Sequence, residues 1–310
     1  MIAELFSASV LIVILTSGIR LATPYLYAAI GETFGQRSGV LNLGVEGQML
    51  LGAFAAFYVS LVSGSLWLGV LAALLVGAAM GLAMAFVTVN LHAQQGISGI
   101  GFYLFGLGMS DLLFQMLLGK VVTINGFAKV GIPLLSAIPV IGDVFFDQSL
   151  LVYGAYLLVP LAWFVLNKTT LGLQIRSVGE NPEAADSLGV SVARIRYFTI
   201  ILGGALSGIA GASLSISLLN VFQQNMTSGQ GFIAVALVYF GAWRPVGVLA
   251  GALLFSMVNS LQLWIQVLGI PVPSDIAVML PYILTIIVLV LSVSRVRAPS
   301  ALTKTFEREE

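Results

Sequence analysis

Long apolar stretches follow one another along almost the whole chain, separated by short polar segments. Most approach the length of about 20 residues that an α-helix needs to cross a bilayer. The apolar residues are continuous instead of alternating every second position, which excludes a transmembrane β-barrel. The pattern predicts an all-α polytopic membrane protein, a bundle of roughly nine or ten transmembrane helices. The polar interruptions lie at residues 31–42, 63–65, 91–95, 119–148, 167–196, 220–230, 243–245 and 269–275.

The distribution of basic residues predicts which loops face the cytoplasm. Basic side chains gather in the segment 167–196, and cytoplasmic loops are the ones enriched in Lys and Arg. Alternation of the helices then places residues 243–245 and the tail 295–310 on the cytoplasmic side, and we expect this tail to be a solvated end. The side of the N-terminus stays open, because residues 21–35 fit either a second short span or the end of one long helix. The basic residues of the cytoplasmic segment are Lys168, Arg176, Arg194 and Arg196.

Composition narrows the class of protein further. Of the 310 residues, 59% are hydrophobic and 8% charged, which excludes a water-soluble globular protein. The absence of cysteine excludes disulfides and thiolate metal sites, and the single histidine, His92, argues against an imidazole metal site. The formal net charge of zero provides no argument for nucleic-acid binding. We expect one transmembrane domain over residues 1–310, with no bound metal.

The most polar cluster predicts a broken helix on a substrate pathway. Residues 35–48 contain four glycines and several hydrogen-bonding side chains immediately before an apolar stretch. Such a segment needs protein or water partners for its backbone, as in the discontinuous helices of transporters. Asn42 and Glu46 are four residues apart and share a helical face, and Gln48 lies in the following turn. We predict that these three side chains line the pathway; the alternative is a helix cap in which Glu46 is tied to a neighbouring helix.

A second polar run, residues 220–231, precedes a later apolar stretch. Interrupted segments in both halves of a transporter indicate its binding site, so Gln223 and Asn225 are further candidates for the pathway. An ordinary external loop explains this run equally well. The small residues at helical spacing in 77–81, 204–208 and 247–251 are interpreted as packing devices that let helices approach closely.

The cytoplasmic segment contains the signals of a short, capped helix. Asn181 suits an N-cap, Pro182 suits the first helical position, and Glu183 places negative charge in the first turn. Gly189 then provides a stop. We predict a short helix outside the membrane within the loop 168–196.

This helix resembles the EAA loop of ABC importer permeases. Glu183-Ala184-Ala185 and Gly189 match that signature, and residues 171–182 and 203–212 are similar to the permeases for branched-chain amino acids, simple sugars and nucleosides. The block 37–47 is closest to the nucleoside type. The resemblance implies a coupling helix that docks on a separate ATPase. The residues that would carry this coupling are Asn181, Pro182, Glu183, Ala184, Ala185, Leu188 and Gly189.

The same resemblance implies the rest of the assembly. Such permeases work in pairs with two cytoplasmic ABC ATPases and an extracytoplasmic substrate-binding lipoprotein, in the bacterial cell membrane. Nucleoside-type systems pair two different permeases, so the second permease subunit is expected to be a different chain. No phosphate-binding loop occurs here, since Gly119-Lys120 lacks the upstream glycine and is followed by Val121. ATP would therefore bind to the partner, and this chain would hold no cofactor.

The function predicted from the sequence is ATP-driven import of a small polar solute, with nucleosides favoured over simple sugars and branched-chain amino acids. External docking of the binding protein is expected on residues 119–148. A proton-coupled secondary transporter that uses Glu46 and Asp111 is the alternative from another class, because carboxylates within a membrane are functional by default. An enzyme has little support, since no acid–base pair or nucleophile constellation stands out.

Overall fold

A computed structural model describes residues 8–133, 135–136, 138–267 and 297–307, together with residues 273, 276, 279–283, 286–287 and 290. The regular secondary structure of the described part is helical apart from two three-residue strands, which confirms the all-α class. The elements are α2 (Ala8–Arg37), α3 (Val45–Ser63), α4 (Leu66–Ala85) with a π-helical turn η1 (Phe86–Asn90), α5 (Gln95–Leu117), β1 (Lys129–Gly131), α6 (Ile141–Phe145), β2 (Asp147–Ser149), α7 (Leu150–Lys168), α8 (Thr170–Glu180), α9 (Pro182–Ser187), α10 (Val192–Ser213) with a π-helical turn η2 (Leu214–Leu218), α11 (Gln230–Phe240) and α12 (Pro245–Val267).

Seven of the described helices are long and apolar enough to cross a membrane, so the predicted count of nine or ten is not reached in this part of the chain. Two differences explain this. Residues 21–35 continue α2, which runs through Pro24 as one helix of 30 residues. The apolar stretch after 230 forms α11, whose 11 residues reach about 16 Å, roughly half of a bilayer core. The predicted loop 269–275 and most of the apolar stretch after it lie outside the described residues.

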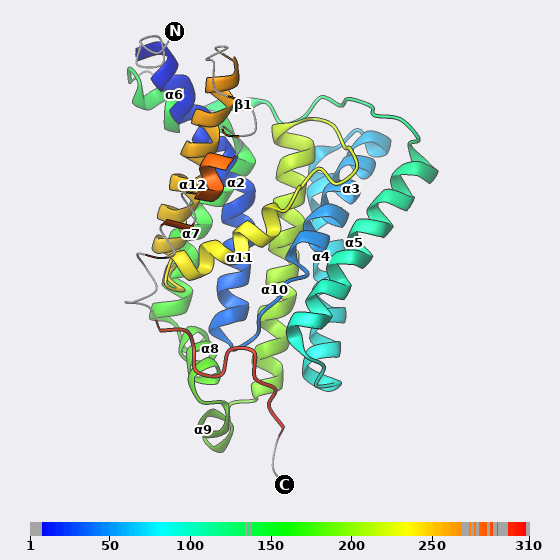
Figure 1. Ribbon diagram of the computed structural model, residues 1–310, viewed down its shortest axis with the longest axis vertical. Coiled ribbons are helices and arrows are strands. Elements are labelled where there is room, and N and C mark those ends of the chain that lie inside the picture. Colours follow the sequence, from blue (N-terminus) through cyan, green and yellow to red (C-terminus); the bar gives the residue numbers. More distant parts are fainter. Residues whose placement is uncertain are drawn as a thin grey trace.

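The helices form one elongated bundle with two different ends (Figure 1). The start of α2, the strand β1 and α6 lie at one end, which we call the α6 end. The helices α8 and α9 and the described tail 297–307 lie at the other, which we call the α9 end. At the α6 end, β1 pairs antiparallel with β2, and the backbone N–H of Ile124 donates to the carbonyl of Asn220 at 3.0 Å. The long loop 118–149 is therefore attached to the segment that leads into α11.

The helix α10 lies at the centre of the bundle, against α2, α3 and α4. Glycines make these approaches close. A Cβ on Gly204 would collide with the carbonyl oxygen of Gly77, and one on Gly208 with that of Ala73. On the α3 side, a Cβ on Gly52 would lie 2.6 Å from the Cα of Gly208. The predicted packing role of the small residues in 77–81 and 204–208 is thus confirmed.

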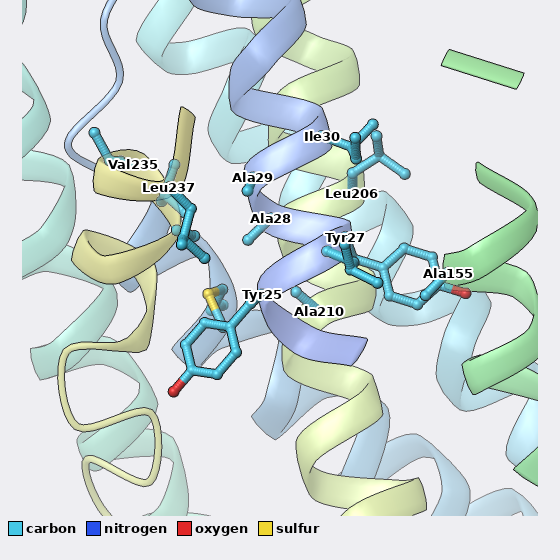
Figure 2. Packing of buried hydrophobic residues seen from close by; sticks show 14 of the residues in the cluster. Tyr25, Tyr27, Ala28, Ala29, Ile30, Ala155, Leu206, Ala210, Val235 and Leu237 are labelled. Carbon is cyan, nitrogen blue, oxygen red and sulfur yellow. The ribbon is translucent and has the colours of Figure 1, made fainter. Parts of the chain in front are cut away.

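The largest buried apolar cluster surrounds α2, the other helix in the middle of the bundle. Figure 2 shows Ile30 beside Leu206 of α10, with Tyr27 directed towards Ala155 of α7. Tyr25 points to another side of α2 from Tyr27 (Figure 2), and its ring contacts Phe255 of α12. The Tyr27 hydroxyl donates to the carbonyl of Leu151 at 2.9 Å, which satisfies its polar atom within the apolar environment.

Most described residues of the C-terminal tail are exposed, as expected for a solvated end, but the part around Ala301 is packed against the α9 end. Ala301 is only 3% exposed. Its backbone N–H donates to the carbonyl of Gly179 at 2.9 Å, and the N–H of Thr303 donates to that of Gly39 at 3.1 Å. Backbone pairing between such distant segments leaves no local sequence pattern, which is why the composition of the tail suggested a free end. Residues 295–296 and 308–310 lie outside the described part.

The glycine contacts of α10 predict a measurable difference between two identical substitutions. Gly204→Ala is expected to lower the thermal unfolding midpoint in detergent by roughly 3 °C or more, because its methyl group forces α10 away from Gly77 of α4. Gly101→Ala is the matched control, since no heavy atom lies within 4 Å of a Cβ added to this helical glycine. An equal fall in both variants would contradict the close-packing argument.

Candidate substrate pathway

The two polar runs picked out from the sequence meet in the interior through Glu46. Glu46 is the second residue of α3 and is 1% exposed. Its Oε1 accepts hydrogen bonds from the Thr227 hydroxyl and, at 2.7 Å, from the N–H of Gly229; its Oε2 accepts from the N–H of Gly231. Gly229 is the N-cap of α11, and Gly231 is in its first turn. We call Glu46 with these three donors the Glu46 clamp.

Local chemistry explains why a carboxylate occupies this position. The first N–H groups of a helix have no partner within the helix, and the N-terminus carries a partial positive charge. Glu46 lies in the first turn of α3 and receives its hydrogen bonds from the start of α11, so two helix N-termini stabilise one negative charge. Gly231 is required for this approach, because a Cβ there would lie 2.5 Å from the backbone nitrogen of Glu46.

Figure 1 shows how the chain reaches the clamp from both ends of the bundle. The segment 38–44 comes from the α9 end and leads into α3, whose first residues are all buried. The segment 219–229 comes from the α6 end and leads into the short helix α11 within the bundle. Both irregular segments are held by protein partners, as backbone at this depth requires.

A second polar network lies beside the segment 38–44. The Glu32 carboxylate accepts from the backbone N–H of Asn42 and the Gln36 side chain, both at 3.0 Å. Gln36 in turn accepts a hydrogen bond from the indole N–H of Trp243 at 2.7 Å. The sequence pattern did not single out Glu32 or Trp243, and Gln36 was included only as a member of the polar run 35–48. The spacing of Glu32 and Gln36, four residues apart in a helix, was the available signal.

Among the predicted pathway residues, Asn42, Glu46 and Gln48 are all buried. The Asn42 side chain accepts from the N–H of Gly44 at 2.9 Å and donates to Gln48 at 3.2 Å, while the Nε2 of Gln48 is buried without a partner. Gln223 and Asn225 are exposed. In the described part of the chain neither side chain hydrogen-bonds to Glu46; within this run the Thr227 hydroxyl and the backbone N–H groups of Gly229 and Gly231 do.

A cavity of about 170 Å³ lies next to the clamp and combines aromatic with uncharged polar side chains. Gln230, at the start of α11, has a buried Oε1 with no hydrogen-bond partner among the described residues. The rings of Tyr25 and Phe255 meet edge to face at 5.3 Å. The polar side chains that line it in the described part of the chain are amides and hydroxyls, which can hydrogen-bond to the hydroxyl or amide groups of a solute. Its walls are formed by Tyr25, Thr227, Ser228, Gln230, Ile233, Phe255, Asn259, Gln262, Pro281 and Tyr282.

The short helix predicted between Asn181 and Gly189 is present as α9. The Asn181 side chain accepts from the N–H of Ala184 at 3.0 Å, and Pro182 occupies the first helical position. Gly189 has φ of +84°, a conformation that favours glycine after a helix. Leu188 is 85% exposed at the tip of this helix, whereas Ala185 is buried against the bundle. The sequence analysis did not separate the preceding helix α8, whose Gly179 packs on the carbonyl of Arg37 at the end of α2.

Glu46 and Asp111, the carboxylates considered for proton transport, differ in their hydrogen bonding among the described residues. All three hydrogen bonds of the Glu46 clamp come from the segment 227–231. Asp111 lies on α5, and its Oδ1 is buried without a hydrogen-bond partner among the described residues. A carboxylate engaged by two backbone donors and a hydroxyl joins two helices, which is the alternative interpretation of Glu46 given above.

These features define a polytopic helical membrane protein with helix N-termini that converge on a buried polar centre. The chain belongs to the family described as branched-chain amino acid transport system / permease component, whose model matches residues 14–289. It is a permease subunit of an ABC transporter, and such subunits are not enzymes themselves.

Three curated relatives match nearly the whole chain. The putative glucose ABC transporter permease protein TsgC13 of Haloferax volcanii is 37% identical over 96% of this chain and 98% of its own. The guanosine ABC transporter permease protein NupQ of Bacillus subtilis is 37% identical over 94% of this chain and 95% of its own length. The nucleoside ABC transporter permease protein NupC of Lactococcus lactis is 38% identical over 90% of this chain and 92% of its own length. No solved structure matches the sequence at a significant level.

The Glu46 clamp predicts a large effect of a nearly isosteric substitution. Glu46→Gln is expected to lower the free energy of unfolding by about 2 kcal/mol, because it removes the charge and turns an amide N–H₂ group towards N–H donors. The measurement is the thermal unfolding midpoint of the detergent-solubilised protein. Asp143→Asn, which neutralises an exposed carboxylate in α6, is the control and is expected to change stability by less than about 0.5 kcal/mol. Equal midpoints for Glu46→Gln and the unmodified protein would show that the clamp contributes nothing.

Proposed function

We propose that this chain is the permease of an ATP-driven nucleoside importer. The observation that carries the proposal is the identity of 37–38% over at least nine-tenths of the chain with permeases named for guanosine and nucleosides. The cavity beside the Glu46 clamp supports it, because aromatic rings can stack on a base while amide and hydroxyl groups bond to base edges and a ribose. The relative named for glucose makes a simple sugar the second candidate.

The partners follow from the same relationship. Both the guanosine and the nucleoside systems have a second, more distant permease relative of this chain, NupP at 30% identity and NupB at 24%. We therefore infer that the chain pairs with a different permease. The other expected partners are two ABC ATPases and an extracytoplasmic binding protein. The binding protein would dock on residues 119–148 at the α6 end.

The orientation proposed here places the α9 end in the cytoplasm. Basic residues of the segment 167–196 support this, as do Arg37 and Arg244, which line a cavity with Arg176 of α8. The start of α2 lies at the opposite end, so the first helix would begin outside the cytoplasm.

The mechanism begins with a displacement of α9 by the ATPase. Leu188 supplies an exposed apolar contact for the partner, and α9 is joined to α10 by only four residues. The helix α10 packs closely on α3 through Gly52 and Gly208 and on α4 through Gly77, so it moves these helices with it. Movement of α3 would shift the Glu46 clamp, α11 and the adjoining cavity, and thereby open the pathway to alternate sides.

Uptake by the reconstituted four-subunit complex tests the solute. With ATP inside proteoliposomes and the binding protein outside, labelled guanosine is expected to accumulate and to be unaffected by excess glucose or leucine. If glucose accumulated and guanosine did not, the transported solute would be a sugar and not a nucleoside. Uptake by the permease alone under a pH gradient would favour a secondary transporter.

The same assay assigns the side chains that contact the solute. Asn259→Ala is expected to reduce uptake efficiency by about tenfold, the effect of one lost hydrogen bond. Gln223→Ala, in the exposed part of the run 220–231, is the matched comparison and is expected to leave uptake nearly unchanged. A loss of uptake in Gln223→Ala but not in Asn259→Ala would show that the solute contacts the external segment and not the cavity.

The coupling role of α9 is tested by two glycines with similar backbone geometry. Gly189→Val and Gly64→Val both place a branched residue at positive φ, +84° and +69°, in open space. We expect similar losses of stability from the two changes, but only Gly189→Val, at the α9 end, is expected to abolish uptake and solute-stimulated ATP hydrolysis. Glu183→Ala is expected to have the same effect without backbone strain. Full uptake in both Gly189→Val and Glu183→Ala would refute the coupling role.

A further inference from the structure

A second cavity, of about 250 Å³, lies at the α9 end and is separate from the proposed pathway. It is bounded by η1, by the link between α4 and α5, by the start of α10 and by the described tail. Its polar residues are Thr88, His92, Asp186, Ser191 and Arg196, and Phe306 of the tail forms part of its wall.

Arg196 is the residue that makes this cavity unusual. The side chain is 98% buried, since Arg196 is only 2% exposed, and its Nε and Nη2 have no hydrogen-bond partner. Within the described residues no ion pair to Arg196 is formed. A buried cation is normally paired, because removing it from water without a partner is unfavourable by several kcal/mol. The backbone of Gly39 lies close to the guanidinium, since a Cβ added to this glycine would be 3.2 Å from Nη2.

The start of α10 adds further donors to the same cavity. Ser191, Val192 and Ala193 line it, and they are the N-cap and first two residues of this 22-residue helix. The Ser191 side chain makes no capping hydrogen bond, so the first N–H groups of α10 are not satisfied by it. Together with Arg196, one turn further along, these groups form a positive site that accepts an anion from the cavity side.

The other titratable groups around the cavity modulate this charge. His92 lies 3.9 Å from Glu307 of the tail, an ion pair when the imidazole is protonated. Asp186 of α9 also borders the cavity and has interactions of its own. The Thr88 hydroxyl donates to the carbonyl of Met84 at 2.8 Å and is therefore no donor for a ligand. The anion would be held by Arg196, Ser191 and the α10 N-terminus, with His92 at the rim.

We propose that this cavity is a binding site for a phosphate group. A guanidinium offers paired donors that match phosphate oxygens, and a helix N-terminus favours the negative charge of a phosphate. The site lies at the start of a membrane-spanning helix, so the group can come from the headgroup of an anionic phospholipid or from a soluble phosphate compound. Occupation would neutralise Arg196 and join α10 to the α4–α5 link directly beside α9.

The first arm of the test uses inorganic phosphate and the purified full chain in nanodiscs of zwitterionic phosphatidylcholine. Phosphate is expected to raise the thermal unfolding midpoint in a saturable way at constant ionic strength. Arg196→Gln is expected to weaken this effect by at least about tenfold, because it removes the charge-assisted pair. Arg194→Gln, an exposed arginine two residues away with the same change of charge, is the matched control and is expected to respond like the unmodified protein.

The second arm uses phosphate-free buffer and compares phosphatidylglycerol with phosphatidylcholine nanodiscs. If the group belongs to a lipid, phosphatidylglycerol alone raises the midpoint, and Arg196→Gln removes the difference. Arg196→Lys keeps a positive charge but loses the paired donors of the guanidinium. A rise in the midpoint that is present but smaller than in the unmodified protein supports the site even if Arg196→Gln folds poorly. Identical responses of the unmodified protein and both Arg196 variants in both arms, or an equal loss in Arg194→Gln, would overturn the proposal.

Discussion

The acceptance of three hydrogen bonds by Glu46 is the interaction on which the interior depends. It connects the start of α3 with a segment more than 180 residues further along the chain. Without this carboxylate, two backbone N–H groups and a hydroxyl would be left unpaired where no bulk water is available. The irregular segments 38–44 and 219–229 can enter the bundle because partners within the protein satisfy them.

The helix α10 gives this polar centre a mechanical connection to the α9 end. Its glycines remove the side chains that would otherwise separate it from α3 and α4, and rigid, closely packed helices transmit displacement. The helix α8 contacts the end of α2 at Gly179, and the tail is hydrogen-bonded to both Gly179 and Gly39. The helix α8 and the tail are thereby attached to α2 and to the segment 38–44, which leads into α3 and the Glu46 clamp.

The candidate site was predictable from the sequence only in part. Asn42, Glu46 and Gln48 stood out because polar residues beside an apolar span are unfavourable unless they have partners. Their partners could not be named. Thr227 lies 181 residues from its acceptor Glu46, and Trp243 lies 207 residues from its acceptor Gln36. No local sequence pattern indicates such distant pairs. Within the run 220–231 the sequence does not distinguish Thr227, which turns inward, from the exposed Gln223 and Asn225.

The sequence by itself determined the features that depend on near neighbours: membrane-spanning apolar lengths, the capped helix after Asn181, the glycine contacts of α10 as a packing device, and the permease family. Only the tertiary structure decided that residues 21–35 continue α2, that α11 ends after 11 residues, and that Ala301 is buried. It also places Arg196 beside a cavity, with its Nε and Nη2 unpaired among the described residues. Helix periodicity and capping are set within about four residues. Whether a buried polar group is satisfied depends on segments that only folding brings together.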